Sequence, residues 1–161
     1  MQKKSKRLVK EMQENKKPGD FFYLQPLPDD LYTWHFTFIG QKDTPYHNGL
    51  YHGKISLPSD YPLSPPDIYY LNENGRYKIN SKICLTITSH HKESWTPAWT
   101  LRTMMQAISA YFLVEDSGIG SIRNSADVRK KFAAKSRDFK CSHCGYLTEI
   151  EKTIKNGWDK K

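Results

Sequence analysis

Three groups of residues in this sequence have types and spacings that could support chemistry. Cys84 lies in the apolar run Ile83-Cys84-Leu85, and the pair His90 and His91 follows it six and seven residues later. A cysteine thiolate is both a good nucleophile and a good leaving group, so it suits a residue that carries an acyl group. A free cysteine is also a common small residue of hydrophobic cores, and Cys84 taken alone does not decide between these interpretations.

The third group, Cys141-Ser142-His143-Cys144, lies near the end of the sequence. One Cys-x-x-Cys pair is half of a common type of zinc site, and the three cysteines of the chain leave no second pair to complete it. Two cysteines and one histidine could still bind a metal weakly or across a dimer. We expect instead a free, exposed cysteine pair and no metal centre.

The composition limits the kind of protein. The 161 residues are enough for one domain with one substantial core. The formal net charge is +8, and much of the excess lies in residues 3–10 and 129–140. We expect these segments to be solvated helix faces or a docking surface for an acidic protein, with no nucleic acid partner. An odd number of cysteines without a signal peptide favours a reducing compartment.

The elements that must position these residues predict one α+β domain with helices segregated from an antiparallel sheet. Residues 5–16 predict an opening helix that Ser5 caps and Pro18-Gly19 end. Segments rich in β-branched and aromatic residues predict a four-stranded meander over residues 21–25, 32–39, 50–57 and 68–71. The chain from 72 to 97 is irregular, and a loop of that length in a small domain tends to be functional.

Two further helices are predicted after this loop. Thr100 caps the first, whose core face is formed by Leu101, Met104, Met105, Ile108 and Phe112. Residues 117–124 are a connection, and residues 125–139 predict a second, basic helix. No run of residues approaches the roughly 18 apolar residues of a membrane span. We therefore expect a catalytic domain over residues 1–140 and a polar C-terminal extension over residues 141–161.

Three motifs occur in a fixed order along the predicted domain: Pro58-x-x-Tyr61-Pro62-x-x-Pro65-Pro66, then Ile83-Cys84-Leu85, then Trp95-x-Pro97-Ala98. Each motif is weak alone, but the ordered set over residues 5–140 resembles the ubiquitin-conjugating enzyme family. The resemblance implies that family's UBC fold, with an N-terminal helix, a four-stranded meander, a long active-site loop and C-terminal helices. It also implies that Cys84 accepts ubiquitin as a thioester from a ubiquitin-activating enzyme and passes it to protein substrates, without a cofactor.

Other segments resemble the tail-anchored J class of this family, which belongs to the endoplasmic reticulum. They are Trp34-His35, Thr44-Pro45-Tyr46, Tyr51-His52-Gly53-Lys54, Asn74-Gly75-Arg76-Tyr77 and Trp95-Thr96-Pro97-Ala98-Trp99. The resemblance implies a role in degradation of misfolded proteins at the cytosolic face of that membrane. The C-terminal membrane helix of the class has no counterpart among these 161 residues, so we expect this chain alone to be soluble and cytoplasmic.

The residues that assist the thiol depart from the family pattern. Most members have His-Pro-Asn before the cysteine, whereas the matching residues here are Asn72-Glu73-Asn74. The amide of Asn74 would stabilise the oxyanion of acyl transfer or hold the loop in shape, and Asn80 is a second candidate. His91, together with His90, would act as a general base toward serine or threonine acceptors, because imidazole titrates near neutral pH. Loop histidines are, however, mostly solvent-exposed spacers.

The resemblance also implies a surface for a RING-type ubiquitin ligase on the first helix and two nearby loops. The matching residues are Arg7, Lys10, Leu63, Pro97 and Ala98. Leu63 is an apolar residue flanked by prolines, which suits an anchor in a hydrophobic groove. The basic residues of the helix would also suit an acidic surface on the activating enzyme.

Two other classes of protein compete with this interpretation. A papain-type hydrolase needs a base with its own orienting partner near the thiol, and neither His35 nor His52 has the sequence context of those families. A catalytically inactive variant domain would bind ubiquitin or a ligase without carrying either. Such variants typically lack the cysteine, so the presence of Cys84 argues against this alternative.

Overall fold

The computed structural model of the protein describes residues 5–83, 85, 93–114 and 118–158. A four-stranded antiparallel sheet in the order β1-β2-β3-β4 forms its centre. The strands are β1 (Phe22–Leu27), β2 (Asp30–Ile39), β3 (Leu50–Ser56) and β4 (Asp67–Tyr70). The predicted α+β class and the meander are therefore confirmed, with strand ends that differ by one or two residues from the expected ones.

The strand β1 is longer than expected because it includes Pro26. We expected this proline to end the strand, since proline lacks the N–H that a sheet ladder needs. Because β1 lies at the edge of the sheet, only one side of it must pair, and proline is tolerated in edge strands. The register with β2 shifts directly afterwards, between Pro26 and Leu27.

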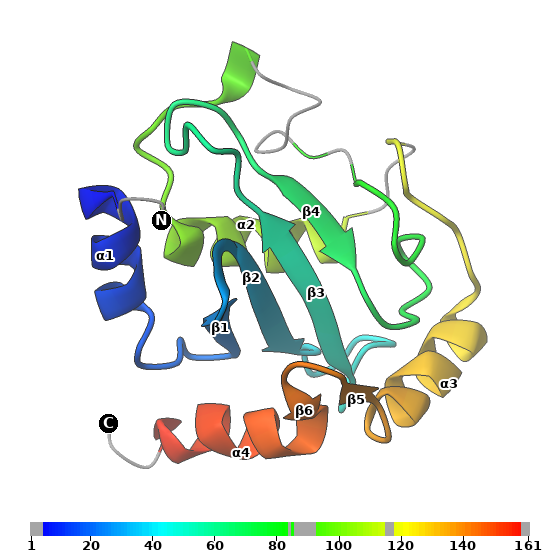
Figure 1. Ribbon diagram of the computed structural model, residues 1–161. Helices are drawn as coiled ribbons and strands as arrows, with labels where there is room; N and C mark the ends of the chain where they lie inside the picture. The colour runs from blue at the N-terminus through cyan, green and yellow to red at the C-terminus, as the bar shows by residue number, and fades with distance from the viewer. Residues whose placement is uncertain (1–4, 84, 86–92, 115–117, 159–161) are drawn as a thin grey trace.

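Two helices begin at the caps that the sequence predicts. The helix α1 (Lys6–Glu14) begins after Ser5, whose side chain accepts a hydrogen bond from the backbone of Leu8. The helix α2 (Leu101–Phe112) begins after Thr100, which forms a reciprocal capping box with Thr103. In Figure 1, α2 passes behind the sheet and α1 lies beside β1.

The main core fills the space between the sheet and α2. The core face of α2 buries the five residues that the sequence predicts, Leu101, Met104, Met105, Ile108 and Phe112. Aromatic side chains from the sheet meet this helix closely: the ring of Phe112 lies 5.3 Å from that of Phe38 and 4.7 Å from that of Tyr51. Packing of this kind adds to the burial of large apolar surfaces.

The C-terminal residues form a second, smaller core on the sheet. After α3 (Ala126–Ser136), a short hairpin of β5 (Lys140–Cys141) and β6 (Gly145–Tyr146) leads into α4 (Leu147–Asn156). Leu147, Ile150 and Ile154 of α4 form a buried cluster with Leu50 of β3. Residues 141–161, which we expected to be a polar extension, thus contain a helix that contacts β1, β2 and β3 and lies below the sheet in Figure 1.

Candidate active site

The residues expected to do chemistry lie partly outside the described part of the structure. Cys84, His90 and His91 belong to the residues that the structure does not describe. Asn74 and Asn80, the residues flanking Cys84, and all five expected ligase-binding residues are described. The described residues on both sides of Cys84 therefore form the structural frame of the site.

The residues directly before and after Cys84 are fixed in the core. Ile83 is fully buried and Leu85 is 3% exposed. The backbone N–H of Ile83 donates to the carbonyl of Ile68 in β4, at 3.1 Å. The residue before it, Lys82, forms a bridge with Tyr69 of the same strand. The apolar residues around the cysteine thus anchor the loop to the edge of the sheet, and they account for the run Ile83-Cys84-Leu85.

A glycine on a second segment packs against this anchor. Gly120 has a left-handed φ of 85°, and a Cβ atom built on it would lie 2.8 Å from the carbonyl oxygen of Lys82. Only glycine satisfies both constraints, because other residues rarely adopt this φ and have no room for a side chain here. The carbonyl of Gly120 also accepts from the backbone of Lys78 at 2.7 Å. The sequence analysis treated residues 117–124 as a connection, and the Gly118-Ile119-Gly120 spacing was the one signal of this close approach.

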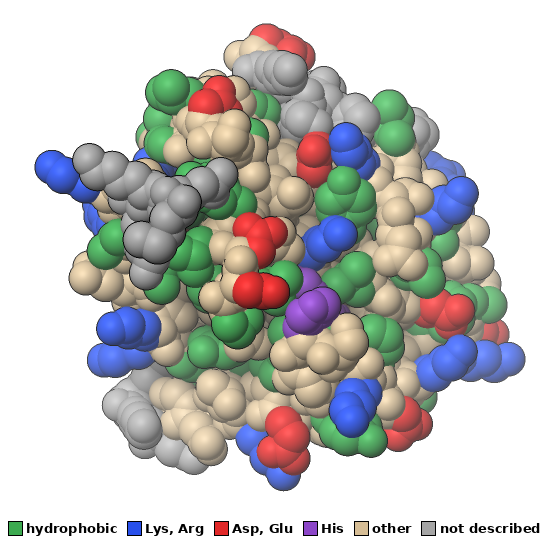
Figure 2. All heavy atoms as spheres, in the orientation of Figure 1, with side chains coloured by type: hydrophobic (Ala, Val, Ile, Leu, Met, Phe, Trp, Pro, Cys, Tyr) green, Lys and Arg blue, Asp and Glu red, His purple; other side chains and the backbone are tan. Residues whose placement is uncertain are grey.

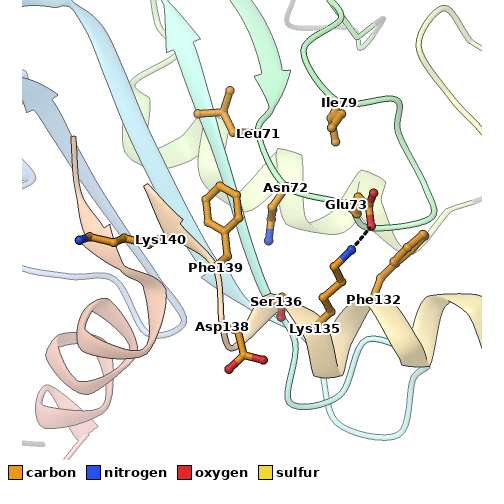
Figure 3. Close-up of a pocket in the computed structure, with 10 residues that line it drawn as sticks. All are labelled: Leu71, Asn72, Glu73, Ile79, Phe132, Lys135, Ser136, Asp138, Phe139 and Lys140. Atoms are coloured by element: carbon orange, nitrogen blue, oxygen red, sulfur yellow. Dashed lines mark hydrogen bonds and ion pairs between the residues drawn. The ribbon is translucent and has the colours of Figure 1, made fainter. Parts of the chain in front are cut away.

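The side chains of the triplet Asn72-Glu73-Asn74 make separate contacts. Asn72 is buried against β3, where it accepts from the backbone of His52 and donates to the carbonyl of Leu50. Glu73 points toward α3 and pairs with Lys135 at 3.3 Å, across a cavity of about 420 Å³ whose lining is drawn in Figure 3. The side chains at the first two positions therefore have structural contacts of their own.

The third side chain of the triplet, Asn74, is 1% exposed and hydrogen-bonded at both ends of its amide. Its Oδ1 accepts from the backbone N–H groups of Arg76 at 2.8 Å and Tyr77 at 2.7 Å. Its Nδ2 donates to the carbonyl of Asn72 at 3.0 Å. Asparagine is well suited to such turns because its side chain bonds its own backbone two residues on. These contacts favour the second of the two expected roles, that of holding the loop.

Asn80 has a backbone explanation of its own. Its φ is 59°, in the left-handed region that asparagine tolerates better than most residues. It is exposed, and its N–H donates to the carbonyl of Tyr70 in β4 at 2.8 Å. The turn at the start of the Lys82–Ile83 segment is sufficient reason for an asparagine at this position.

Arg76 is a structural residue whose role the sequence did not indicate. It is fully buried, and its guanidinium donates to carbonyls at the end of α2, those of Tyr111, Phe112 and Val114. It also stacks on the ring of Tyr77, with 4.5 Å from Cζ to the ring centre. A cation at a helix C-terminus is favourable because the last carbonyls of a helix lack partners. Arg76 thus links the loop before Cys84 to the helix after it.

The expected ligase surface is brought together by one arginine. The guanidinium of Arg7 on α1 donates to the carbonyl of Pro97 at 2.8 Å and to that of Trp99. It also lies over the ring of Tyr61, so that it contacts both loops that the resemblance implicates. The indole N–H of Trp95 donates to the carbonyl of Pro62 at 2.9 Å and joins the two loops to each other.

On this surface the remaining expected residues are open to solvent. The side chain of Leu63 is 72% exposed, a high value for a leucine. Pro97 and Ala98 are exposed as well, and Lys10 pairs with the neighbouring Glu14 at 3.9 Å. Arg7 is the exception, because its contacts with the loops bury most of it. Leu63 is therefore the residue best placed to contact a partner, and Arg7 shapes the surface rather than offering a free charge.

A buried glutamate fixes the same region from inside. Glu11 of α1 accepts from the backbone N–H of Leu101, the first residue of α2, at 2.8 Å and from the hydroxyl of Tyr61 at 3.2 Å. Burial raises the pKa of this carboxyl, and the bond to Leu101 and the charge of Arg7 oppose that shift. Glu11 thereby holds α1, α2 and the proline-rich loop in one arrangement.

The expectation of an exposed cysteine pair is wrong for Cys141. Neither Cys141 nor Cys144 forms a disulfide, but Cys141 is 6% exposed and Cys144 is half-buried. Their sulfur atoms face His35, which the sequence suggested as part of the J-class segment Trp34-His35 and as a candidate base of a hydrolase, but not as a neighbour of these cysteines. Figure 2 shows a face on which Lys and Arg side chains are interspersed with acidic and apolar ones.

The comparison with known proteins decides the family. The model of the family described as ubiquitin-conjugating enzyme matches residues 7–140. The chain belongs to the ubiquitin-conjugating enzyme family. Human ubiquitin-conjugating enzyme E2 J1 is 43% identical over 156 residues, which are 96% of this chain and 49% of that protein. Mouse ubiquitin-conjugating enzyme E2 J2 is 35% identical over 143 residues, or 87% of this chain and 55% of that protein.

Solved structures of the family agree with the fold. Human ubiquitin-conjugating enzyme E2 G1 superposes with a TM-score of 0.57 at 30% identity, over 65% of this chain and 90% of that one. The enzyme Pex4p of H. polymorpha, solved in complex with the soluble domain of Pex22p, superposes with a TM-score of 0.66 at 21% identity, over 81% of this chain and 96% of that one. The UBC fold implied by the motifs is thus confirmed.

The chain spans about half the length of the curated relatives it matches. Over the described residues, no helix is both long and apolar enough to cross a membrane. The names of the relatives, E2 J1 and E2 J2, agree with the J-class resemblance of the sequence.

Proposed function

We propose that this protein accepts ubiquitin from a ubiquitin-activating enzyme as a thioester on Cys84 and transfers it to the side chains of protein substrates. The observation that supports this most strongly is the family match over residues 7–140, which spans the Ile83-Cys84-Leu85 motif. The buried anchors Ile83 and Leu85 hold the chain on both sides of that cysteine. In the first step, the thiolate attacks the ubiquitin thioester of the activating enzyme, whose own thiolate leaves.

A charging assay tests this function directly. The protein is mixed with ubiquitin, activating enzyme and ATP, and the products are separated with and without reductant. We expect one ubiquitin adduct that reductant removes, and in Cys84→Ser an adduct that resists reductant, because an oxygen ester replaces the thioester. Absence of any adduct on Cys84 would refute the proposal and support the non-catalytic variant domain instead.

The transfer step needs a neutral acceptor and a stabilised oxyanion. A lysine amine with a pKa near 10.4 is only about one part in a thousand neutral at pH 7, so burial beside the thioester would favour the reactive form. We assign Asn74 to holding the turn that precedes Cys84, because both ends of its amide are bonded to the backbone. In this role it positions the active-site loop for either kind of acceptor.

We further propose His91, with His90, as the base for hydroxyl acceptors. A serine or threonine hydroxyl is a weaker nucleophile than an amine and needs a base of near-neutral pKa. The double variant His90→Gln, His91→Gln should lose transfer to free serine more than transfer to free lysine. Equal rates of transfer to both acceptors would refute the assignment, and normal charging of Cys84 would serve as the control.

The RING-type ligase is proposed to dock on the surface formed by Arg7, Lys10, Leu63, Pro97 and Ala98. Its apolar anchor is Leu63, which is 72% exposed on one of the two loops that Arg7 and Trp95 hold together. Leu63→Ala should lower ligase-stimulated discharge of ubiquitin and leave charging unchanged. Val114→Ala is a matched control, because Val114 is also an exposed aliphatic residue but lies at the end of α2. An equal loss in both variants would contradict a specific anchor at Leu63.

We place the protein at the cytosolic face of the endoplasmic reticulum, in degradation of misfolded proteins, because its motifs and relatives belong to the J class. A membrane anchor outside the 161 residues would hold it there. Fractionation of cells that express the native gene product should recover it with reticulum membranes. Recovery in the cytosolic fraction alone would refute this location without affecting the proposed chemistry.

A further inference from the structure

Four side chains from three separate parts of the chain meet at one point beneath the C-terminal hairpin. They are His35 of β2, His52 of β3, Cys141 of β5 and Cys144 of the following turn, and their ligand atoms all lie within 4.8 Å of one another. We propose that these residues bind a zinc ion in a tetrahedral Cys2His2 site that attaches the C-terminal hairpin to the sheet. This site is separate in sequence from Cys84 and does not depend on the proposed transferase activity.

The three distances from Nδ1 of His35 to the other ligand atoms fit this ion. Zinc binds histidine nitrogen at about 2.0–2.1 Å and cysteine sulfur at about 2.3 Å, so the edges of a tetrahedral site are roughly 3.3 Å for N···N and roughly 3.6 Å for S···N. Here Nδ1 of His35 lies 3.3 Å from Nε2 of His52. The same Nδ1 lies 3.6 Å from Sγ of Cys141 and 3.5 Å from Sγ of Cys144.

The second shell prepares one histidine for a metal. Nδ1 of His52 lies 2.8 Å from the hydroxyl of Thr37, which is 1% exposed. When Nδ1–H donates to that hydroxyl, the other ring nitrogen, Nε2, is left with a lone pair directed at the cluster. A hydrogen bond from the distal ring nitrogen is the usual way in which metal-binding histidines are oriented.

The surroundings of the two histidines favour the neutral imidazole, which is the form that binds zinc. Burial disfavours the charged form of both imidazoles and so lowers the pKa of His35 and of His52. Burial and the nearby Cys141 raise the pKa of the Cys144 thiol to about 12 without a metal. Zinc would displace one proton from each thiol, and two thiolates with two imidazoles would give a site of zero net charge. A buried site of zero net charge avoids the cost of an isolated charge.

The backbone around the cysteines has the shape that a Cys-x-x-Cys ligand pair needs. Cys141 pairs with Gly145 across the β5–β6 hairpin, and Cys144 is the last residue of the turn between these strands. Gly145 has a φ of 82°, which a glycine adopts without strain. A cavity of about 400 Å³ beside the cluster, lined in part by Lys54 and His143, provides a path for entry of the ion.

From the sequence we expected no metal, because Cys141, Cys144 and His143 alone do not complete a zinc site. His35 lies 106 positions before Cys141, and His52 lies 92 positions before Cys144. They become neighbours only because β2 and β3 pair with His35 opposite Lys54 and Thr37 opposite His52, which places both histidine rings on one face. His143 lies 5.5 Å from His35 between ring centres and is exposed.

The test is metal analysis of the purified full chain, prepared without chelator from cells grown with zinc. We expect about one zinc per chain by mass spectrometry of the metal. Titration of Co²⁺ into chelator-stripped wild-type protein should give thiolate-to-cobalt charge-transfer bands and the intense visible bands of tetrahedral cobalt. Because this titration uses the wild type, it does not depend on whether a variant folds. Stripping the metal should also speed hydrogen exchange in α4, since the hairpin before it would be released.

The variants assign the ligands. His35→Gln with His52→Gln, and Cys141→Ser with Cys144→Ser, should both lose zinc, while His143→Ala and Cys84→Ser should each retain it. The proposal is overturned by wild-type protein that holds no zinc and shows no tetrahedral cobalt spectrum. It is also overturned by zinc retained in the double histidine variant, by zinc lost in His143→Ala, or by a Cys141–Cys144 disulfide in freshly purified protein.

Discussion

Replacement of Asn74 separates the two roles that its amide could have in ubiquitin transfer. Asn74→Ala removes the acceptor for the N–H groups of Arg76 and Tyr77, both of which are buried. An unsatisfied buried donor costs about 1–3 kcal/mol, so the loss of the acceptor for two donors should destabilise the protein by roughly 2–6 kcal/mol. For a domain of this size a loss of about 3 kcal/mol lowers Tm by roughly 6–12 °C.

The matched variant is Asn74→Asp, which retains an oxygen acceptor for both N–H groups but has no N–H to donate. If Asn74 holds the turn, this variant should recover most of the lost Tm. It should also discharge ubiquitin from Cys84 to free lysine within about tenfold of the wild-type rate, a difference of about 1.4 kcal/mol. If the amide donates to the oxyanion instead, the variant should be slower by about 10²–10³ although it is stably folded.

The assay is single-turnover discharge of precharged protein to free lysine, performed below the Tm of every variant and normalised to the fraction charged. Thermal unfolding of the same preparations gives the stability. A stable Asn74→Asp variant with discharge as slow as that of Asn74→Ala would refute the positioning role. Unchanged Tm in Asn74→Ala would refute the estimate of its structural contribution.

Three other predictions concern the frame of the site and the C-terminal helix. Arg76→Met should destabilise the protein by about 3–5 kcal/mol in urea unfolding, because the carbonyls at the end of α2 lose their buried charged donor; a loss below about 1 kcal/mol, as is usual at the surface, would contradict that role. Asn80→Gly should leave the stability of the protein unchanged or raise it, and Asn80→Ala should lower it by about 1 kcal/mol, because the left-handed φ of 59° disfavours a Cβ atom. Slow discharge of ubiquitin in a stable Asn80→Gly variant would instead indicate a role for the Asn80 side chain. Arg137→Ala should cost about 1–3 kcal/mol at pH 7 in the same assay, through loss of the bonds of 2.7 and 3.0 Å to Glu151. Arg137 lowers the pKa of Glu151, so the stabilisation by this ion pair is present above the ordinary carboxyl pKa and is lost as pH falls through the lowered pKa. A difference in stability between wild type and Arg137→Ala that persisted in acid would contradict the assignment.

The family and most of the fold could be predicted from local sequence. Ser5 and Thr100 mark helix starts because capping depends only on the next few residues. The core face of α2 follows from the spacing of its apolar residues, and the strands follow from their β-branched and aromatic content. Pro26 is the exception, because its tolerance depends on the position of β1 at the edge of the sheet.

The contacts around the candidate site could not be predicted from local sequence. The sequence placed Asn74 at the matching family position, but it left open whether the amide serves the reaction or the loop, since its partners had to be seen. Arg76 was only part of a motif until its contacts with the end of α2 were known. Both cases depend on how the loop before Cys84 folds back, which no local propensity specifies.

What the sequence by itself determined is the family, the candidate nucleophile Cys84 and the order of the elements, because these depend on motifs and short-range periodicity. The tertiary structure decided which distant residues meet. It placed Leu63 on an exposed surface bounded by α1, and it brought the ligand atoms of His35, His52 and the two cysteines near the C-terminus to within 4.8 Å of one another. The physical reason is that strand pairing and helix packing fix contacts over a hundred residues apart, and such contacts leave no local pattern in the chain.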